Sequence, residues 1–150
     1  MNVSEDHVTF SIKQYLLADG WEILQYHAPG GQAAWCLTIN GEMHYADIIA
    51  YRNDSVLYLE NKARYDLDDV SKVRRVMTSD DAKNQIERFV RIQCRVRGLA
   101  EPGVLSFEWA HGFARAFPPS VSRDIVYYHV DATGQVSRFD SAAPIRESCD

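Results

Sequence analysis

The stretch YADIIAYRNDSVLYLENKA, residues 45–63, decides the fold of this chain. Its first arm, YADIIAY, is apolar on both faces, which is typical of a central strand covered on both sides. Asn53-Asp54 is a turn signal, and VLYLENKA, residues 56–63, has the apolar and aromatic content of a second strand. We therefore expect two buried antiparallel strands that fold back on each other about residues 53 and 54.

The flanking patterns predict the other elements. Ser4 before Glu5 and Asp6 indicates a capped helix start, and Gly20 a helix end. Asn40-Gly41 is a strong hairpin signal. The expected order is a helix over 4–20, a strand over 21–27, a loop at 28–31, hairpin arms over 35–39 and 42–51, the strand over 56–63, a loop with a short helix over 65–78, a long helix over 79–97, strands near 104–117 and 125–130, and a short strand after 132–134.

This order predicts an α/β (α+β) fold in which a mixed central β-sheet is flanked by helices. At 150 residues the chain has the size of one compact domain, with a core over about residues 4–130. The last residues, about 141–150, are expected to be a loosely ordered tail.

Composition limits the function classes. Apolar residues make up 46% and charged residues 25%, which is ordinary for a soluble globule. No apolar run approaches the roughly 20 residues of a membrane-spanning helix. The first residues lack a secretory signal pattern, so we expect a cytoplasmic protein with no membrane partner. Cys36, Cys94 and Cys149 form no CxxC pair, which argues against a zinc ribbon or a redox pair.

The charge is distributed unevenly. The net charge is −5. Residues 62–97 hold ten Lys/Arg against six Asp/Glu, a balance of +4, so the remainder carries −9. The acidic total weakens a nucleic-acid hypothesis without excluding it. The basic residues Arg64, Lys72, Arg74 and Arg75 follow the second strand and are expected to contact phosphates or to form a solvated surface.

Three charged residues in the deciding stretch carry the chemistry: Asp47, Glu60 and Lys62. Residues two apart on a strand leave the same face, so Glu60 and Lys62 should point together. A hairpin turning at 53–54 would place Asp47 level with Glu60. Two carboxylates can share a hard cation such as Mg²⁺, and a nearby ammonium can stabilise a charged phosphate. The alternative is an exposed ion pair of little energetic value, but charges in such apolar strands are costly unless they are paired or bound to metal.

This pattern resembles the PD-(D/E)XK nuclease superfamily, in which an acid on the second core strand precedes a (D/E)XK triplet on the third. Asp47 and the triplet Glu60-Asn61-Lys62 match it, with Ala46 in place of the proline. The resemblance implies a restriction-endonuclease-like core and Mg²⁺-dependent hydrolysis of DNA, with Mn²⁺ able to substitute. Asp47 and Glu60 would be metal ligands and Lys62 the catalytic lysine.

The resemblance also implies an acid from the first helix. Glu5 is the best-placed catalytic candidate, with Asp6 and Glu22 as rivals and helix capping as an alternative role for Glu5. Gln85 is similar to a glutamine that some subfamilies place on the later helix, although an exposed helix glutamine is the preferred interpretation.

The predicted activity is therefore that of a DNA endonuclease, with RNA not excluded as a substrate. Cleavage of both strands would favour a homodimer. Two other hypotheses stay open. One is a non-catalytic nucleic-acid- or protein-binding module on the same fold, and the other is a subunit of a larger DNA-processing complex.

Overall fold

The computed structural model describes residues 4–27, 35–115 and 124–140. The predicted loop at 28–31 and the predicted tail at 141–150 lie outside this part. The described elements, in chain order, are α1 (Glu5–Ala18), β1 (Glu22–Tyr26), β2 (Leu37–Ile39), β3 (Glu42–His44), β4 (Ile48–Arg52), β5 (Ser55–Asn61), α2 (Leu67–Met77), α3 (Asp80–Val96), β6 (Ser106–Phe113), β7 (Val126–Val130) and β8 (Val136–Phe139).

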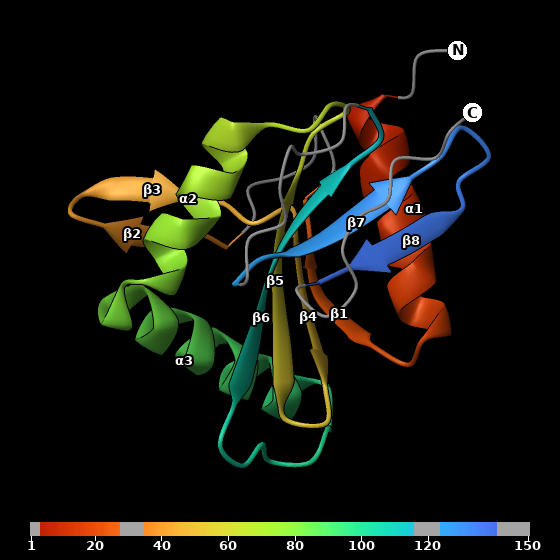
Figure 1. Ribbon diagram of the computed structural model, residues 1–150. Helices are drawn as coiled ribbons and strands as arrows, with labels where there is room; N and C mark the ends of the chain where they lie inside the picture. The colour runs from red at the N-terminus through yellow and green to blue at the C-terminus, as the bar shows by residue number, and fades with distance from the viewer. Residues whose placement is uncertain (1–3, 28–34, 116–123, 141–150) are drawn as a thin grey trace.

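A six-stranded mixed sheet forms the centre of the molecule (Figure 1). The strand order is β1-β4-β5-β6-β7-β8. β6 runs parallel to both β5 and β7, and the remaining neighbours are antiparallel. β2 and β3 form a separate two-stranded ribbon. The predicted mixed sheet flanked by helices is confirmed.

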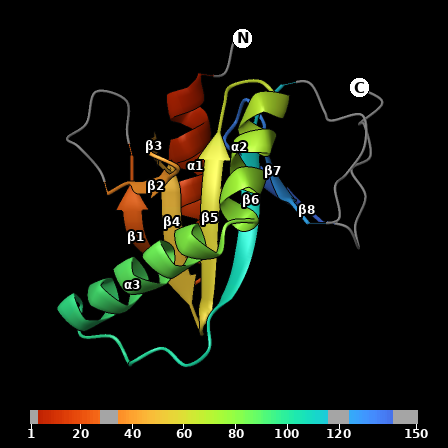
Figure 2. The same cartoon turned by 90° about the vertical axis from the view of Figure 1, so that its left-hand side faces the viewer.

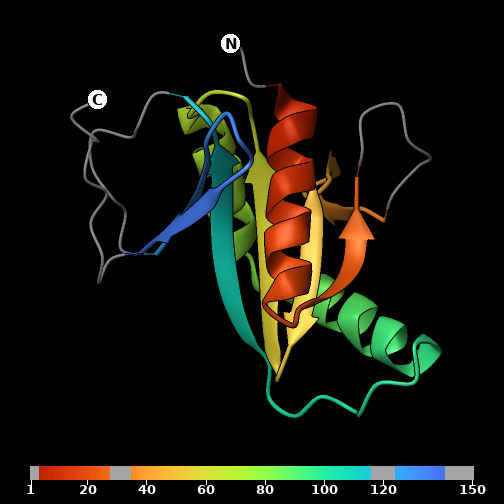
Figure 3. The same ribbon diagram turned by 90° about the vertical axis from the view of Figure 1, so that its right-hand side faces the viewer.

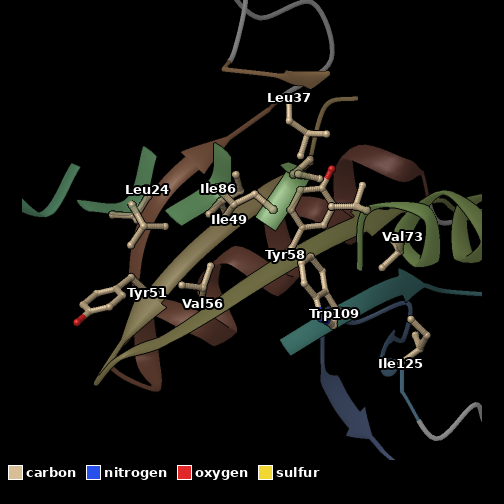
Figure 4. Packing of buried hydrophobic residues seen from close by; sticks show 14 of the residues in the cluster. Leu24, Leu37, Ile49, Tyr51, Val56, Tyr58, Val73, Ile86, Trp109 and Ile125 are labelled. Carbon is tan, nitrogen blue, oxygen red and sulfur yellow. The ribbon is translucent and has the colours of Figure 1, made fainter. Parts of the chain in front are cut away.

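Helices cover the two faces of this sheet. α1 lies across one face (Figure 3), and α2 and α3 lie on the other (Figure 2). Side chains that alternate along β5 divide between two cores: Leu57 and Leu59 pack with α1, whereas Val56 and Tyr58 pack with α2 and α3. Figure 4 shows the second core. The double apolar face of β4 and β5 is therefore explained by helices on both sides.

The predicted β4–β5 hairpin is present. Asn53 and Asp54 have positive φ angles of 48° and 64°, the backbone that a two-residue type I′ turn requires. The pairing runs from Arg52 opposite Ser55 to Ile48 opposite Leu59. The pairing ends at Ile48, and Asp47, the residue before β4, lies beside the end of β5, where its N–H donates to the carbonyl of Leu59 at 3.0 Å.

The predicted strand over residues 42–51 is wrong in one respect, because it is two strands. β3 ends at His44, which pairs with Leu37 in the ribbon, and β4 begins at Ile48 between β1 and β5. Residues 45–47 carry the chain from one sheet to the other. A continuous apolar pattern does not record such a change of partners. α2 is also longer than the short helix predicted within residues 65–78.

Gly112 marks where α1 approaches the sheet most closely. A Cβ atom at this position would lie 2.5 Å from Cδ1 of Ile12 and 3.1 Å from Cβ of Asn61. Only glycine lets the helix sit this close to β5 and β6. The first turn of α1 is thereby held near the carboxyl end of β5.

Among the described helices, none is long and apolar enough to cross a membrane.

A candidate active site at the carboxyl end of strand β5

Asp47 lies one residue before β4 and is held by the main chain on both sides. Its N–H donates to the carbonyl of Leu59 at 3.0 Å, and its carbonyl accepts from the N–H of His27 at 2.8 Å. Its Oδ2 accepts from the backbone N–H of Asn61 at 2.8 Å. The half-buried carboxylate is therefore fixed across the end of β5. Burial raises the pKa of Asp47 to about 7, against the lowering effect of the Asn61 hydrogen bond.

Glu60 is the most buried member of the predicted set, with 8% of its surface exposed. Within the described residues, its Oε2 has no hydrogen-bond partner. Burial, together with the nearby charges of Asp69 and then Asp47, raises the pKa of Glu60 to about 8. Tyr58, two residues earlier on the same strand, likewise has a buried hydroxyl that no described residue bonds. A buried polar atom without a partner is costly, and a bound ligand would relieve that cost.

Lys62 follows the end of β5, and its N–H continues the parallel pairing by donating to the carbonyl of Gly112 at 3.0 Å. Its ammonium lies 4.0 Å from Oε1 of Glu5, and both side chains are about 40% exposed. The charge of Asp69 is the largest cause of the raised pKa of Lys62, and the charges of Glu5 and Asp47 raise it further. The lysine is therefore a permanent cation among carboxylates.

Glu5 reaches this edge from the first turn of α1. The link between this turn and β5 is a chain of hydrogen bonds: Asn61 Nδ2 donates to Thr9 Oγ1 at 2.6 Å, and Thr9 Oγ1 donates to the carbonyl of Glu5 at 3.0 Å. The N-cap predicted for the helix is Ser4, whose side chain accepts from the N–H of His7. Glu5 is free of that capping bond and pairs with Lys62.

The two rivals of Glu5 are placed differently. Asp6 is exposed on α1. Glu22 pairs with Tyr51 at the opposite end of β4, where it lines a cavity of about 560 Å³ together with Asn53 and Asp54. Glu22 is therefore far along the strand from Asp47. Of the predicted acids, the structure brings Asp47, Glu60 and Glu5 to one edge of the sheet and leaves Glu22 at the other.

Asp69 is an acid of this edge that sequence reasoning missed. It lies in the first turn of α2 and is 4% exposed. One of its oxygens is 3.8 Å from Nζ of Lys72. Burial raises the pKa of Asp69 to about 6, and the neighbouring Lys62 acts against this shift. The only sequence signal was an acid at a helix start, which is ordinary helix chemistry and points to no site.

Gln85 does not belong to this edge. Its side-chain amide donates to the carbonyl of Thr38 at 2.9 Å and its Oε1 accepts from the N–H of Thr38 at 3.0 Å. The glutamine thus joins α3 to the free edge of β2. Two of the residues predicted to contact phosphates form ion pairs within the protein: Lys72 pairs with Asp69, and Arg75 pairs with Glu42 at 3.3 Å.

Burial raises the pKa values of Asp47, Glu60 and Asp69, and the charge of Asp69 adds to the rise at the other two. Within residues 4–27, 35–115 and 124–140, no three acidic, histidine or cysteine side chains converge as a preformed metal cluster.

No protein-family model matches the sequence, and no curated protein matches it.

Proposed function

We propose that this protein is a metal-dependent nuclease that hydrolyses phosphodiester bonds, with DNA as its most suitable substrate. The observation that carries the proposal is the β4–β5 hairpin, which brings Asp47 to the end of β5, where it bonds Leu59 and Asn61 on either side of Glu60. Glu60 has an Oε2 atom that no described residue bonds, and Lys62 lies two residues further on. Support also comes from the order of elements, a helix before the antiparallel strands β1, β4 and β5 and a long helix after them, which resembles the restriction-endonuclease-like core.

The donor set suits a hard divalent cation. Mg²⁺ is held in proteins by one or two carboxylates together with water and phosphate oxygens, so Asp47 and Glu60 are sufficient protein ligands without a third. Both carboxyls have raised pKa values, and Glu60 Oε2 has no partner among the described residues. A cation bound between Asp47 and Glu60 would offset the repulsion between their negative charges. When bound, it supplies polarisation of the phosphate and a water of lowered pKa.

The residues of the chain have separate roles in this proposal. Lys62 stays protonated because carboxylates surround it, so its ammonium can offset negative charge on a phosphate oxygen and orient a water molecule. Glu5 holds that ammonium from the side of α1. Asn61 holds Asp47 through its backbone and α1 through its side chain.

The direct test is incubation of the protein with supercoiled DNA, linear DNA and RNA in Mg²⁺ or Mn²⁺. We expect the wild type to cleave DNA and Lys62→Ala to lose at least about 100-fold in rate, as removal of one charge-stabilising group does in other enzymes. Lys83→Ala is the matched control, since Lys83 is a partly exposed lysine on α3 that pairs with Asp80 of the same helix. Cleavage by Lys62→Ala at the control rate would exclude the proposed role.

The assay also separates the nuclease from a binding module. Binding of Mn²⁺ that is lost in Asp47→Ala, without cleavage of any nucleic acid, would favour a non-catalytic module. Absence of both metal binding and cleavage would exclude a metal-dependent site altogether.

A further inference from the structure

His111, on β6, is fully buried beside the proposed site and makes hydrogen bonds through both ring nitrogens. Its Nε2 lies 3.2 Å from the backbone nitrogen of Asp66, which can only donate. Nε2 is therefore the unprotonated nitrogen of the ring. The proton sits on Nδ1, which donates to the carbonyl of Glu60 at 3.1 Å. The contacts fix one neutral tautomer.

The two groups that His111 joins belong to different parts of the site. Glu60 is the penultimate residue of β5. Asp66 is the N-cap of α2, and its carboxylate accepts from the N–H groups of Asp68 and Asp69. The imidazole therefore connects the strand that carries Glu60 to the first turn that carries Asp69. The main chain also reaches from Glu60 to Asp66 through residues 61–65, but the described hydrogen bonds of that segment run to β6 and the two residues after it, to Asp47 and to α1, and none runs to α2.

The ring is itself held rigidly. Tyr65 packs edge-on against it at 5.6 Å between ring centroids, and Phe113 stacks on it at 6.0 Å. Burial lowers the pKa of His111 to about 4, so the neutral ring persists at neutral pH. A buried, neutral, single-tautomer histidine is a rigid spacer of fixed length between its two partners.

We propose that His111 is a positioning residue, which sets the distance between Glu60 and the first turn of α2. This inference rests on the proposed function, because it assigns His111 to the support of that site. The backbone of Glu60 is anchored by the Nδ1 bond, and the carboxyl group is thereby held where Asp47 and Asp69 both act on it. Without the spacer, α2 still packs on β5 through the core, but its first turn loses the hydrogen-bonded link to Glu60, and the carboxyl of Glu60 loses its fixed relation to Asp69.

The test uses two substitutions of His111 in the full chain. His111→Phe keeps the ring packing against Tyr65 and Phe113 but loses both hydrogen bonds, whereas His111→Gln keeps a donor and an acceptor. Tyr128→Phe is the control for stability: it removes one partly buried hydrogen bond, from Tyr128 to Glu108, on the face that α1 covers. The measurements are Mn²⁺ affinity by calorimetry, kcat and KM on DNA, and the urea midpoint.

We expect His111→Phe to lower Mn²⁺ affinity and kcat by roughly 10- to 100-fold, the effect of losing an outer partner of a metal ligand. KM should change little, and His111→Gln should recover a large part of both losses. Tyr128→Phe should shift the urea midpoint without changing Mn²⁺ affinity. The urea midpoint also establishes that each variant is folded under the conditions of the assay.

The outcomes are distinct. If the wild type binds Mn²⁺ and cleaves DNA while His111→Phe behaves like Tyr128→Phe in both, the positioning role is excluded and the proposed function stands. If His111→Phe does not fold, His111→Gln decides: wild-type Mn²⁺ affinity together with wild-type kcat supports the spacer, and a loss of both as large as that of Asp47→Ala overturns it. A wild type that binds no Mn²⁺ overturns both proposals.

Discussion

The backbone N–H of Asn61 donates to Oδ2 of Asp47 at 2.8 Å, while the side chain of Asn61 donates to Thr9 on α1. The middle residue of the Glu60-Asn61-Lys62 triplet therefore holds the acid of the neighbouring strand and the first helix at the same time. Glu60 and Lys62 carry the charges of the triplet, and Asn61 between them holds Asp47 and α1 beside those charges. The consequences of this arrangement can be measured.

The stability of the metal-free protein should fall as pH rises from about 6.5 to 8. The pKa of Glu60 is about 8 in the folded protein, and that of a free glutamate is about 4.3, so the folded state binds the extra proton. Stability then decreases with pH in the range between the two pKa values. Over this window the loss is on the order of 1–2 kcal/mol. His44 and His111, whose pKa values burial lowers, act in the opposite direction only below about pH 6.5.

Urea unfolding at several pH values in the presence of a chelator measures this effect. Glu60→Gln should make the slope shallower, because the larger of the two proton-binding contributions is gone and only that of Asp47 remains. Asp80→Asn, which removes an exposed carboxylate on α3, should leave the slope unchanged. A wild-type curve that rises from pH 6.5 to 8 would contradict the burial of a protonated Glu60.

Divalent-cation affinity should increase with pH through the same range. Protons and the cation compete for Asp47 and Glu60, whose pKa values are about 7 and about 8. Below the pKa of Glu60, we expect each unit of rising pH to lower the dissociation constant for Mn²⁺ by roughly tenfold for every proton that the cation displaces. Above that pKa the dissociation constant should level off. Calorimetry in two buffers of different ionisation enthalpy also counts the protons released. A pH-independent affinity would mean that the cation binds elsewhere.

Removal of the charge of Asp69 should lower the pKa of Glu60 and of Lys62. Asp69 is the largest charge acting on each of them, in addition to the burial of Glu60. NMR titration of the Glu60 carboxyl carbon in Asp69→Asn measures the first shift. The control is Asp66→Asn, because Asp66 is an acid on the same segment whose charge acts on Lys62 but does not figure among the causes of the Glu60 shift. Equal shifts in the two variants would show that Asp69 is no closer to Glu60 than Asp66 is.

Gly112→Ala should destabilise the fold by about 1–3 kcal/mol, the usual cost of forcing an extra carbon into a packed core. The new methyl group would overlap Cδ1 of Ile12 at 2.5 Å. Ile12→Val removes that atom, so the double variant should recover part of the lost stability. Thermal unfolding of the two single variants and the double variant completes the cycle. Purely additive effects would place the strain at Asn61 instead.

The sequence predicted those parts of the molecule that depend on local pattern. The Asn53-Asp54 turn, the apolar arms on either side and the capped start of α1 are encoded within a few residues of where they occur. From them follows the hairpin that brings Asp47 beside the end of β5. The change of sheet at residues 45–47 was missed, because an apolar pattern shows that a strand is buried but not against which partner.

The missed residues of the candidate site depend on packing between distant elements. Asp69 resembles any acid at a helix start until α2 is docked over β5. His111 resembles a core histidine until its nitrogens are found between Glu60 and Asp66. The sequence does not distinguish Glu22 from Glu5 as the acid of the site, since each lies at the start of an early element, β1 or α1. Only the position of β1 in the sheet shows that Glu22 lies at the other edge. Long-range docking decided each of these cases.

The two-residue turn between β4 and β5 has a consequence for how the chain folds. Asp47 and Glu60 are 13 residues apart, whereas β6 reaches β5 only after the chain has passed through α2 and α3. Contacts of short sequence separation close sooner than long-range ones. The two carboxyls should therefore meet early in refolding, before His111 arrives. We expect refolding in chelator to be faster near pH 6 than near pH 8, since the two carboxyls take up protons as the hairpin buries them and protons are more abundant at pH 6.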